Sequence, residues 1–388
     1  MNQRKIPAVF MRGGTSKAIV FRRDDLPEDR VEWDRIFLAA LGSPDPNARQ
    51  LNGMGGGISS LSKICVVGPS ERPDADVDFT FAQVGVDKEV VGYGANCGNM
   101  SSAIGPFAVD EGLVTVAGDE ATVRIYNTNT DKIIHARFAL DGGLAAVEGD
   151  FELPGVAGEG APVRMEFRDP GGAATGRLLP TDNVIDAIEV PGLATVEASL
   201  VDAANPCVFV EADALGVTGT EAPAHIDAMT EVMENLESVR ARAAVMMGIA
   251  KTPAEATEKF PSVPFVGMVA DPQDADILSG KKVSAADGDL TARVVSSGNV
   301  HRALPLTGAM CLAVAARIDG TVVHRHLRPS AGDDGDIRLI QPSGILPVAC
   351  TVNRTADGWV AEQTAVTRTQ RRLFEGRVLV PGSRVSIA

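Results

Sequence analysis

The sequence predicts an α+β fold of two domains in which many short strands accompany few helices. The chain has 388 residues, more than one hydrophobic core usually organises, so two domains of roughly 100 to 200 residues each are expected. Its 40 glycines and 23 prolines, beside two tryptophans and two tyrosines, indicate short elements joined by tight turns and argue against a helical bundle. Apolar and β-branched runs recur between the turns, as they do in barrels and sandwiches.

The composition excludes several functional classes. A net charge of −15 and a pI near 4.8 oppose binding to a phosphate backbone, so no nucleic-acid partner is expected. No stretch reaches the ~18 uninterrupted apolar residues of a membrane helix, and Met1–Phe10 lacks the apolar run of a secretion signal. The five cysteines are scattered and odd in number, which favours a reduced, cytoplasmic protein without a disulfide framework.

The first elements are a pair of strands and a helix. Apolar runs at Ile6–Phe10 and Ala18–Phe21 flank a segment whose Gly13 and Gly14 predict a turn suited to binding a ligand. From Leu26 to Leu41 the apolar residues recur at helical spacing, and Gly42 and Pro44 end the segment. This pattern predicts a surface helix packed on a sheet.

A second glycine-rich segment, Asn52–Gly57, precedes a run that alternates and then becomes wholly apolar. The run from Ile58 to Val67 predicts a strand that carries Lys63 near its start. Further strand-like runs are Val77–Gln83, Thr115–Asn127, Ile133–Phe138, Val163–Phe167, Ser199–Val210, Phe265–Ala270, Thr291–Val295, Arg338–Ile340 and Val348–Asn353.

One long helix is expected in the second half of the chain, from Ala224 to Ala250. Its core-facing stripe consists of Met229, Met233, Leu236, Val239, Ala243 and Met247. We place the domain boundary near Pro191-Gly192, which gives domains 1–190 and 191–388, with the last strand a candidate to return to the first domain.

The chain also repeats itself weakly. Gly98–Gly112 aligns with Leu306–Gly320 at a constant offset, which pairs two small-residue helices that each end in an acidic residue and a glycine. In this register Cys97 is opposite Pro305, so the thiol has no counterpart in the second helix. Two similar domains with different chemistry are therefore expected.

Cys97 is the first candidate for chemistry. It stands directly before a helical run, among glycines and asparagines, where the positive field of a helix N-terminus favours the thiolate and free N–H groups can receive a carboxylate. The alternative is a buried small apolar residue, as expected for the other four cysteines. The Gly/Asn context favours a functional thiol.

At this point three segments are recognisable. Met11–Lys17, Asn52–Lys63 and Gly94–Ser102 resemble the PrpF family, and the resemblance extends over essentially the whole chain. That family includes 2-methylaconitate and methylitaconate isomerases, aconitate isomerases and 4-oxalomesaconate tautomerases. Its fold is that of diaminopimelate epimerase. The resemblance implies two similar barrel-like β domains, each around a central helix, with the substrate between them.

The resemblance also nominates Lys63 as the partner of Cys97 in acid and base chemistry. In the wider superfamily a pair of cysteines, one per domain, faces the substrate, but here the second position is Pro305, and Cys311 lies further inside the helix. A lysine that is desolvated at the mouth of a cleft can supply a neutral amine as a base. The alternative for Lys63 is a solvated lysine at a strand end.

The substrate implied by this pair is a small unsaturated polycarboxylate. Loss of an allylic proton gives a dienolate, which N–H donors at the helix starts Gly98-Asn99 and Thr307-Gly308 would stabilise. The predicted substrate-binding residues are Thr15, Ser16, Asn52, Ser59, Ser60, Gly98, Asn99, Met100, Asn205, Arg302, Thr307 and Gly308. Within this set, Asn205 precedes Pro206-Cys207, where the epimerases usually have histidine, and Arg302 is either a cationic clamp or half of a surface pair with His301.

Other signals do not indicate a cofactor or a metal. Gly53–Gly57 lacks the third glycine and the βαβ context of a dinucleotide fingerprint, and Gly13–Lys17 lacks the residue order of a phosphate loop. His324–His326 could place two imidazoles on one face of a strand, but no third ligand stands at useful spacing and arginines adjoin it, so a solvated strand is favoured.

The sequence therefore predicts a cofactor-independent 1,3-allylic isomerase that acts on an unsaturated tricarboxylate such as 2-methylaconitate, aconitate or 4-oxalomesaconate. Two alternatives stay open: a non-catalytic accessory or binding protein for an aconitase-like enzyme, and a Cys-dependent hydrolase, which would need a histidine acting on Cys97. The order in which Lys63 and Cys97 act is also open. A homodimer is compatible with the sequence, although no residue pattern specifies one.

Overall fold

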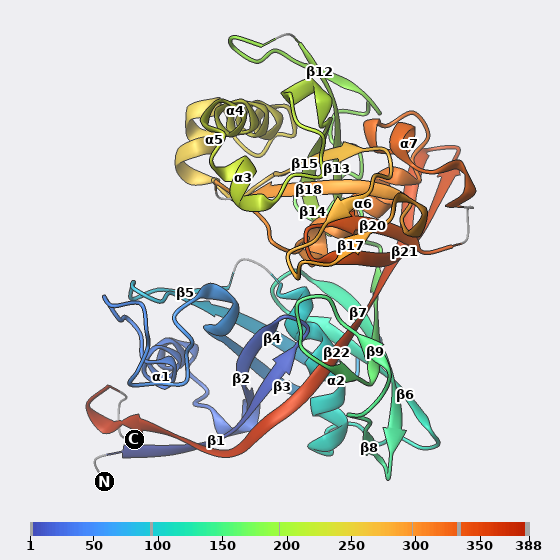
Figure 1. Ribbon diagram of the computed structural model, residues 1–388. Helices are drawn as coiled ribbons and strands as arrows, with labels where there is room; N and C mark the ends of the chain where they lie inside the picture. Colours follow the sequence, from blue (N-terminus) through green and yellow to red (C-terminus); the bar gives the residue numbers. More distant parts are fainter. Residues whose placement is uncertain (1–2, 94–95, 194, 297, 332–334, 385–388) are drawn as a thin grey trace. The chain divides into compact units, whose positions relative to one another are not determined.

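The computed structural model describes residues 3–93, 96–193, 195–296, 298–331 and 335–384. The chain forms two compact units: unit 1 comprises Met1–Glu166 and Thr367–Ala388, and unit 2 comprises Phe167–Val366 (Figure 1). The expected boundary near Pro191-Gly192 differs from this division. Because β12 (Asp186–Ile188) pairs with β13 (Val196–Ala203), the chain before Pro191 already belongs to the sheet of unit 2.

The strands of unit 1 close into a barrel-like layer. Their pairings run β1–β2–β3–β4–β6–β7–β11–β22 and return to β1. The bounds are β1 (Gln3–Gly13), β2 (Ser16–Arg22), β3 (Lys63–Pro69), β4 (Val77–Val84), β5 (Val91–Gly92), β6 (Glu120–Asn127), β7 (Lys132–Asp141), β8 (Leu144–Ala145), β9 (Phe151–Glu152), β10 (Glu159–Gly160), β11 (Pro162–Arg168) and β22 (Gly358–Pro381). The last strand contributes because Gln370–Pro381 pairs with β1.

Helix α2 (Gly98–Asp110) occupies the inside of this layer. It contacts β1, β2, β3, β6, β7 and β8, and it is buried from Met100 to Val109. Small residues allow this close packing. A Cβ atom at Gly105 would lie 2.8 Å from the Cβ of Ala136 and 3.0 Å from the ring of Phe138, both on β7. The backbone of α2 therefore approaches the sheet where a side chain would not fit.

Helix α1 (Arg30–Leu41) covers the opposite face of the same strands. Its buried residues, among them Trp33 and Phe37, form a core with Ile64 and Val66 of β3. Because side chains alternate between the two faces of a strand, Lys63 and Cys65 point to the other face, toward α2. The helix begins after Asp29, whose carboxylate accepts the N–H of Val31, and it ends at Gly42 with φ 78°, close to the predicted end.

Unit 2 repeats this plan. Its strands pair in the order β12–β13–β14–β15–β18–β20–β21–β22, and the buried helix α6 contacts β13, β14, β15 and β21. The further bounds are β14 (Asn205–Glu211), α3 (Pro223–Asp227), α4 (Thr230–Met246), α5 (Pro253–Lys259), β15 (Phe265–Ala270), β16 (Ala275–Asp276), β17 (Lys282–Val283), β18 (Leu290–Ser296), β19 (Asn299–Val300), α6 (Leu306–Ala316), α7 (Val322–His326), β20 (Ile337–Gln341) and β21 (Gly344–Thr355).

The predicted repeat corresponds to a shared order of strand pairings. In unit 1 the successive strand pairings alternate: β1–β2, β3–β4 and β6–β7 are antiparallel, whereas β2–β3 and β4–β6 are parallel. Unit 2 shows the same alternation: β13–β14, β15–β18 and β20–β21 are antiparallel, whereas β14–β15 and β18–β20 are parallel. The expectation of two similar barrel-like units around central helices is confirmed.

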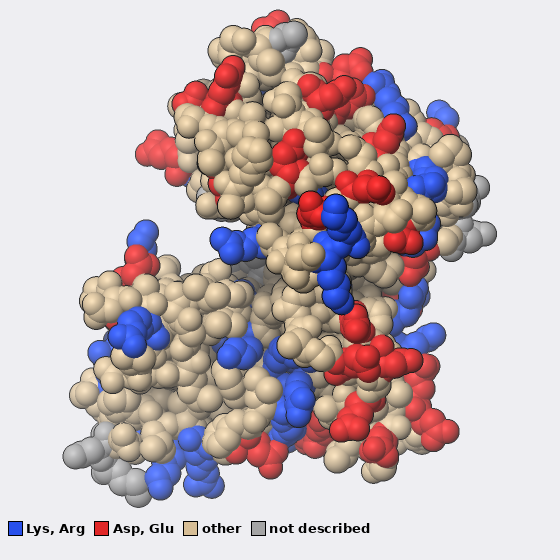
Figure 2. All heavy atoms as spheres, in the orientation of Figure 1, with Lys and Arg blue, Asp and Glu red and all other residues tan. Residues whose placement is uncertain are grey.

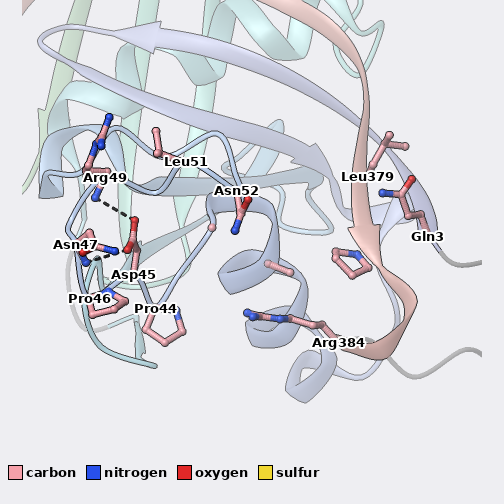
Figure 3. A pocket seen from close by; sticks show the side chains of 13 residues that line it. Gln3, Pro44, Asp45, Pro46, Asn47, Arg49, Leu51, Asn52, Leu379 and Arg384 are labelled. Atoms are coloured by element: carbon pink, nitrogen blue, oxygen red, sulfur yellow. Dashed lines mark hydrogen bonds between the residues drawn. The ribbon is translucent and has the colours of Figure 1, made fainter.

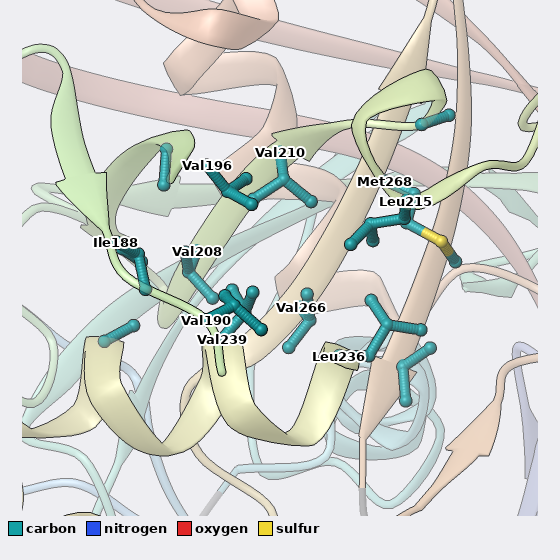
Figure 4. Close-up of a cluster of buried hydrophobic side chains, with 14 of the residues drawn as sticks. Ile188, Val190, Val196, Val208, Val210, Leu215, Leu236, Val239, Val266 and Met268 are labelled. Carbon is teal, nitrogen blue, oxygen red and sulfur yellow. The ribbon is translucent and has the colours of Figure 1, made fainter. Parts of the chain in front are cut away.

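The core of unit 2 lies between α4 and the sheet. Figure 4 shows Leu236 and Val239 of α4 pointing toward Val208 and Val266 of the strands, as the predicted stripe requires. The prediction of a single helix over Ala224–Ala250 is wrong, because this segment forms two helices, α3 and α4. Met229 leaves the helical conformation with ψ 84°, and Asp227, at the end of α3, accepts the backbone N–H of Val300.

Two further predictions need correction. Ser199–Val210 is not one strand but the hairpin β13–β14, which turns at Ala204 with φ 61°. His324–His326 does not lie on a strand: it forms the end of α7, which begins where Thr321 accepts the N–H of His324. No helix among the described residues is long and apolar enough to span a membrane. In Figure 2, acidic side chains gather over the part of unit 1 formed by β6 and β8.

We expect Gly105→Val to destabilise the protein, because the added side chain would collide with Ala136 and Phe138. Overpacking of this kind costs about 1–3 kcal/mol of unfolding free energy, which urea denaturation measures. Gly92→Val is the matched control, since the nearest atom to a Cβ there is the Gln83 carbonyl oxygen at 3.8 Å. Equal unfolding free energies for the two variants would contradict the close packing of α2.

Candidate active site

The turn between β1 and β2 packs directly on the start of α2. A Cβ atom at Gly13 would lie 2.7 Å from the backbone oxygen of Asn99, and one at Gly14, where φ is +51°, would lie 2.2 Å from Asn99 Oδ1. On the other side of the turn, Gly14 N–H donates to the Thr369 carbonyl at 3.0 Å. Only glycine allows this approach, so the predicted ligand turn is fixed against the helix start.

Asn99 connects three segments at this point. Its Nδ2 donates to Thr15 Oγ1 at 3.1 Å, and its Oδ1 accepts from Nε of Arg368 at 3.2 Å. The turn, the helix start and β22 are thereby joined through one amide. Thr15 and Asn99, both predicted to bind substrate, lie in direct contact.

Cys97 occupies the N-cap position of α2. Its backbone carbonyl accepts the N–H of Ser101 at 3.0 Å, but no side chain caps the helix and its first turn contains no acidic residue. The first N–H groups of a helix have no partner within the helix. The amides of Gly98, Asn99 and Met100 are therefore available to a negative charge, beside a thiol that is only half-buried.

The loop before Cys97 is held by asparagines. Asn96 Oδ1 accepts from Ser101 Oγ at 3.3 Å and from Asn127 Nδ2 at 3.2 Å. Asn129 Nδ2 donates to the carbonyl of Tyr93 at 2.7 Å. These bonds tie the Cys97 loop to the end of β6, while Gly94 and Ala95 lie outside the described residues.

Lys63 is the first residue of β3, and its side chain is 8% exposed. Gln83 lies directly opposite on β4, and its Oε1 accepts a hydrogen bond from the Lys63 amine. The amine also lies 5.0 Å from the centre of the Phe81 ring. No described carboxylate forms an ion pair with Lys63, so its partners are a neutral amide and an aromatic face.

Gln83 and Gln50 position the segment that leads into Lys63. Gln83 Nε2 donates to the carbonyls of Ser59 and Ser62, each at 3.0 Å. The buried Gln50 accepts from the hydroxyl of Ser62 at 2.7 Å and from the N–H of Gly57 at 2.8 Å. No local sequence pattern indicates either glutamine, because each acts through contacts with residues outside its own strand or turn.

Lys63 and Cys97 both act electrostatically on the buried residue Cys65. Burial raises the pKa of the Cys65 thiol well above its ordinary value, Cys97 raises it further, and Lys63 lowers it. Both groups are thus close enough to act electrostatically on the same buried sulfur. Cys65 itself is fully buried and is a poor candidate for contact with a ligand.

The structure brings together most of the predicted residues of unit 1. Ser16 is buried at the start of β2, where Ala18 pairs with Lys63, so Ser16 lies on the same face and at the same end of the sheet. Ser59 and Ser60 form the single turn η2 (Ser59–Leu61) before β3. The side chain of Met100 is fully buried, so only its backbone N–H remains for a ligand.

Asn52 does not lie with the other predicted site residues of unit 1. It lines a pocket of about 890 Å³ together with Asp45, Arg49 and Arg384, and the lining includes none of Thr15, Lys63 and Cys97 (Figure 3). The reason is local, because Gly53 packs against the backbone of Leu41 and Gly42 at the end of α1. The structure thus places Asn52 beside α1, on the face of the sheet opposite to α2.

In unit 2 the predicted residues lie around the start of α6. Thr307 and Gly308 are in its first turn, and a Cβ atom at Gly308 would lie 3.1 Å from the ring of Phe265. Asn205 begins β14, with its amide bonded to the adjacent Pro206 carbonyl at 2.8 Å. Arg302 is exposed. A role for these residues in substrate binding stays a prediction.

The strand register shows that Lys63 and Cys97 have no counterparts in unit 2. In unit 1, β2 and β3 begin their parallel pairing at Ala18 and Lys63, whereas in unit 2, β14 and β15 begin theirs at Cys207 and Phe265. Phe265 therefore occupies the place of Lys63. Pro305, the N-cap of α6, occupies the place of Cys97. Neither residue can transfer a proton.

The described residues contain no group of three or more His, Cys, Asp or Glu side chains arranged to hold a metal ion. The site instead consists of an amine, a thiol, free backbone amides and neutral side-chain amides on a glycine-rich frame. The model of the family described as "PrpF protein" matches residues 3–381.

The chain belongs to the PrpF family.

Relatives within this PrpF group carry isomerase names. The chain is 42% identical to the 3-methylitaconate isomerase of Eubacterium barkeri, and the match covers 99% of both chains. It is 39% identical to the 2-methyl-aconitate isomerase of Cupriavidus necator and 36% identical to the (4E)-oxalomesaconate Delta-isomerase of Novosphingobium sp. (strain KA1), each over 98% of both chains.

Solved structures agree with the PrpF assignment. The crystal structure of methylitaconate-delta-isomerase has a TM-score of 0.90 and 40% identity, covering 100% of this chain and 98% of that one. A hydroxyproline epimerase from Agrobacterium vitis has a TM-score of 0.54 at 13% identity, covering 97% and 93%. The second likeness concerns the fold alone and agrees with the predicted diaminopimelate epimerase-like architecture.

We expect iodoacetamide to modify Cys97 before any other cysteine of the native protein. All five cysteines are described, and Cys97 is half-buried while the other four are buried. Peptide mass spectrometry over a time course measures the order of modification. Cys97→Ser should remove the fast phase and leave the slow one. Labelling of Cys350 at the rate of Cys97 would contradict this accessibility.

Proposed function

We propose that this PrpF protein is a cofactor-independent isomerase that moves a proton and a carbon-carbon double bond within a small unsaturated polycarboxylate, with Lys63 and Cys97 as the acid and base. The observation that supports this proposal is geometric: Lys63 begins β3, and Cys97 is the N-cap of α2, the helix that contacts β3. The names of the relatives, which act on methylitaconate, methylaconitate and oxalomesaconate, indicate the class of substrate.

The chemistry is a balanced transfer of one proton. One member of the pair removes a proton from the carbon allylic to the double bond, and the electron pair of the broken C–H bond forms a dienolate. The other member donates a proton to the carbon two positions away, where a new C–H bond forms and the double bond shifts. A buried lysine held by the neutral Gln83 suits this role, because no described carboxylate fixes its proton.

The dienolate needs support for the negative charge that develops on its carboxylate. The amides at the start of α2, which have no partner among the described residues, supply hydrogen-bond donors, and the helix start is the positive end of the helix dipole. Thr15, Ser16 and Asn99 lie beside these amides and can orient the carboxylates of the substrate. The backbone next to Cys97 can therefore bind the dienolate that deprotonation produces.

The arrangement around Cys97 does not favour a Cys-dependent hydrolase. Unit 1 contains a single histidine, His135 on β7. Its neighbours Ile134 and Ala136 are buried, and Gly105 of α2 packs on Ala136, so His135 points to the opposite face of the strand. Within unit 1, no imidazole is therefore placed to activate the thiol.

We expect Lys63→Ala and Cys97→Ala each to reduce kcat by about 10²- to 10⁴-fold, the usual contribution of a general acid or base. The measurement follows the absorbance of methylaconitate, aconitate, methylitaconate and oxalomesaconate side by side, with the incorporation of solvent deuterium into product. Lys88→Ala, at an exposed loop position, is the control. Full turnover in both variants would refute the assignment, and absence of turnover in the wild type would leave the accessory role.

A second variant tests the neutral partner of Lys63. Gln83→Glu would place a carboxylate against the amine, which stabilises its protonated form. We therefore expect the rise of kcat with pH to shift to higher pH when the neutral amine is the base. Gln83→Met removes the hydrogen bond without adding charge and should not produce this shift. Identical pH profiles for Gln83→Glu and the wild type would show that Lys63 does not titrate in catalysis.

A further inference from the structure

Arg368 is a buried cation that has no anionic partner in the described part of the chain. It lies on β22 and is 5% exposed. Its hydrogen bonds go to two neutral acceptors: Nε donates to Asn99 Oδ1 at 3.2 Å, and Nη1 donates to the carbonyl of Thr367 at 3.0 Å. No described residue accepts from Nη2, and no described carboxylate forms an ion pair with the guanidinium. Burial lowers the pKa of Arg368 to about 10, which still leaves it charged at neutral pH.

Two other arginines with low exposure, Arg293 and Arg372, have a structural explanation. Arg293 is 1% exposed and donates to the carbonyls of Glu221, Ala292 and Thr220, which use all three of its nitrogens. Arg372, four residues beyond Arg368, pairs with Glu111 and Glu375. Arg368 alone among these three has neither a full set of acceptors nor a carboxylate. A buried charge costs free energy unless it is paired, so such a group indicates a missing anion.

The position of Arg368 defines where that anion would bind. Its guanidinium touches the side chain of Asn99, the second residue of α2. Among the described residues, no acceptor bonds to the first-turn amides of this helix. The other end of the Asn99 amide is bonded to Thr15. A guanidinium and a hydroxyl thus contact the side chain of one residue in the first turn of α2. A carboxylate accepts hydrogen bonds from all three kinds of donor, and guanidinium matches it with two parallel bonds.

We propose that Arg368 binds one carboxylate of the substrate at the N-terminus of α2 and so helps select polycarboxylates over monocarboxylates. This inference rests on the proposed function and adds to it the group that recognises the charge of the substrate. The residue belongs to the last strand, which the sequence pattern did not connect with the glycine turn or with Cys97. Its pairing with β1 and β11 brings it to the site.

The kinetic test compares Arg368→Gln and Arg368→Lys with Arg371→Gln, an exposed arginine on the same strand. Loss of a charge-assisted hydrogen bond should raise KM for a tricarboxylate substrate by about 10- to 100-fold in Arg368→Gln, with a smaller change in kcat. Arg368→Lys should fall between this variant and the wild type, and Arg371→Gln should not change KM. An unchanged KM in Arg368→Gln would overturn the proposal.

A binding test separates this inference from the proposed reaction. Propane-1,2,3-tricarboxylate has the three carboxylates but no double bond, so it should raise the Tm of the wild type and of Arg371→Gln whether or not the protein is an isomerase. Arg368→Gln should lose this rise. Because it removes an uncompensated buried charge, its Tm without ligand should equal or exceed that of the wild type.

A purely structural arginine would give the opposite pattern. The ligand-free Tm of Arg368→Gln would then fall by several degrees, and the rise with propane-1,2,3-tricarboxylate would persist. Failure of the isomerase proposal appears separately, as full turnover in Lys63→Ala and Cys97→Ala. If the tricarboxylate still stabilised Arg368→Gln, the proposed role of Arg368 would be wrong, while the isomerase proposal would be unaffected.

Discussion

The contact between the β1–β2 turn and the start of α2 is the constraint on which the candidate site depends. A Cβ atom at Gly14 would overlap the Asn99 amide, so the turn and the helix meet only because Gly13 and Gly14 have no side chains. Arg12 holds the turn from the other side by donating to the carbonyls of Gly14 and Thr369, at 3.0 and 2.9 Å. Cys97, Asn99 and Arg368 take their relative positions from this junction.

One scaffold is used twice in the chain, but the two side chains proposed to transfer the proton are present in one copy. The two units share the order of their strand pairings and the central helix, whereas the places of Lys63 and Cys97 hold Phe265 and Pro305 in unit 2. A fold tolerates such divergence because its stability comes from the buried strands and helices, which both units retain. Both Lys63 and Cys97 thus belong to unit 1.

Local patterns in the sequence predicted the strands and both central helices, because alternation and small-residue spacing are local properties. Motifs also led to Lys63, Cys97 and the glycine turn. Gln83 and Arg368 were not found, since their roles come from pairings across β4 and β22 that no local pattern records. The break at Met229 was missed for the same reason: Asp227 is held by Val300, far away along the chain.

The candidate site is electrically unlike the rest of the molecule. The chain carries a net charge of −15, which would repel a polycarboxylate at long range. Screening limits that repulsion to about 8 Å at physiological ionic strength, so the groups within the site decide the local field. There the buried Lys63 and Arg368 have only neutral partners among the described residues, and the first turn of α2 contains no acid. An acidic surface and a buried arginine are compatible because a surface charge is screened by water, while a buried one is not. A carboxylate of the proposed substrate would supply the counter-charge that Arg368 lacks among the described residues.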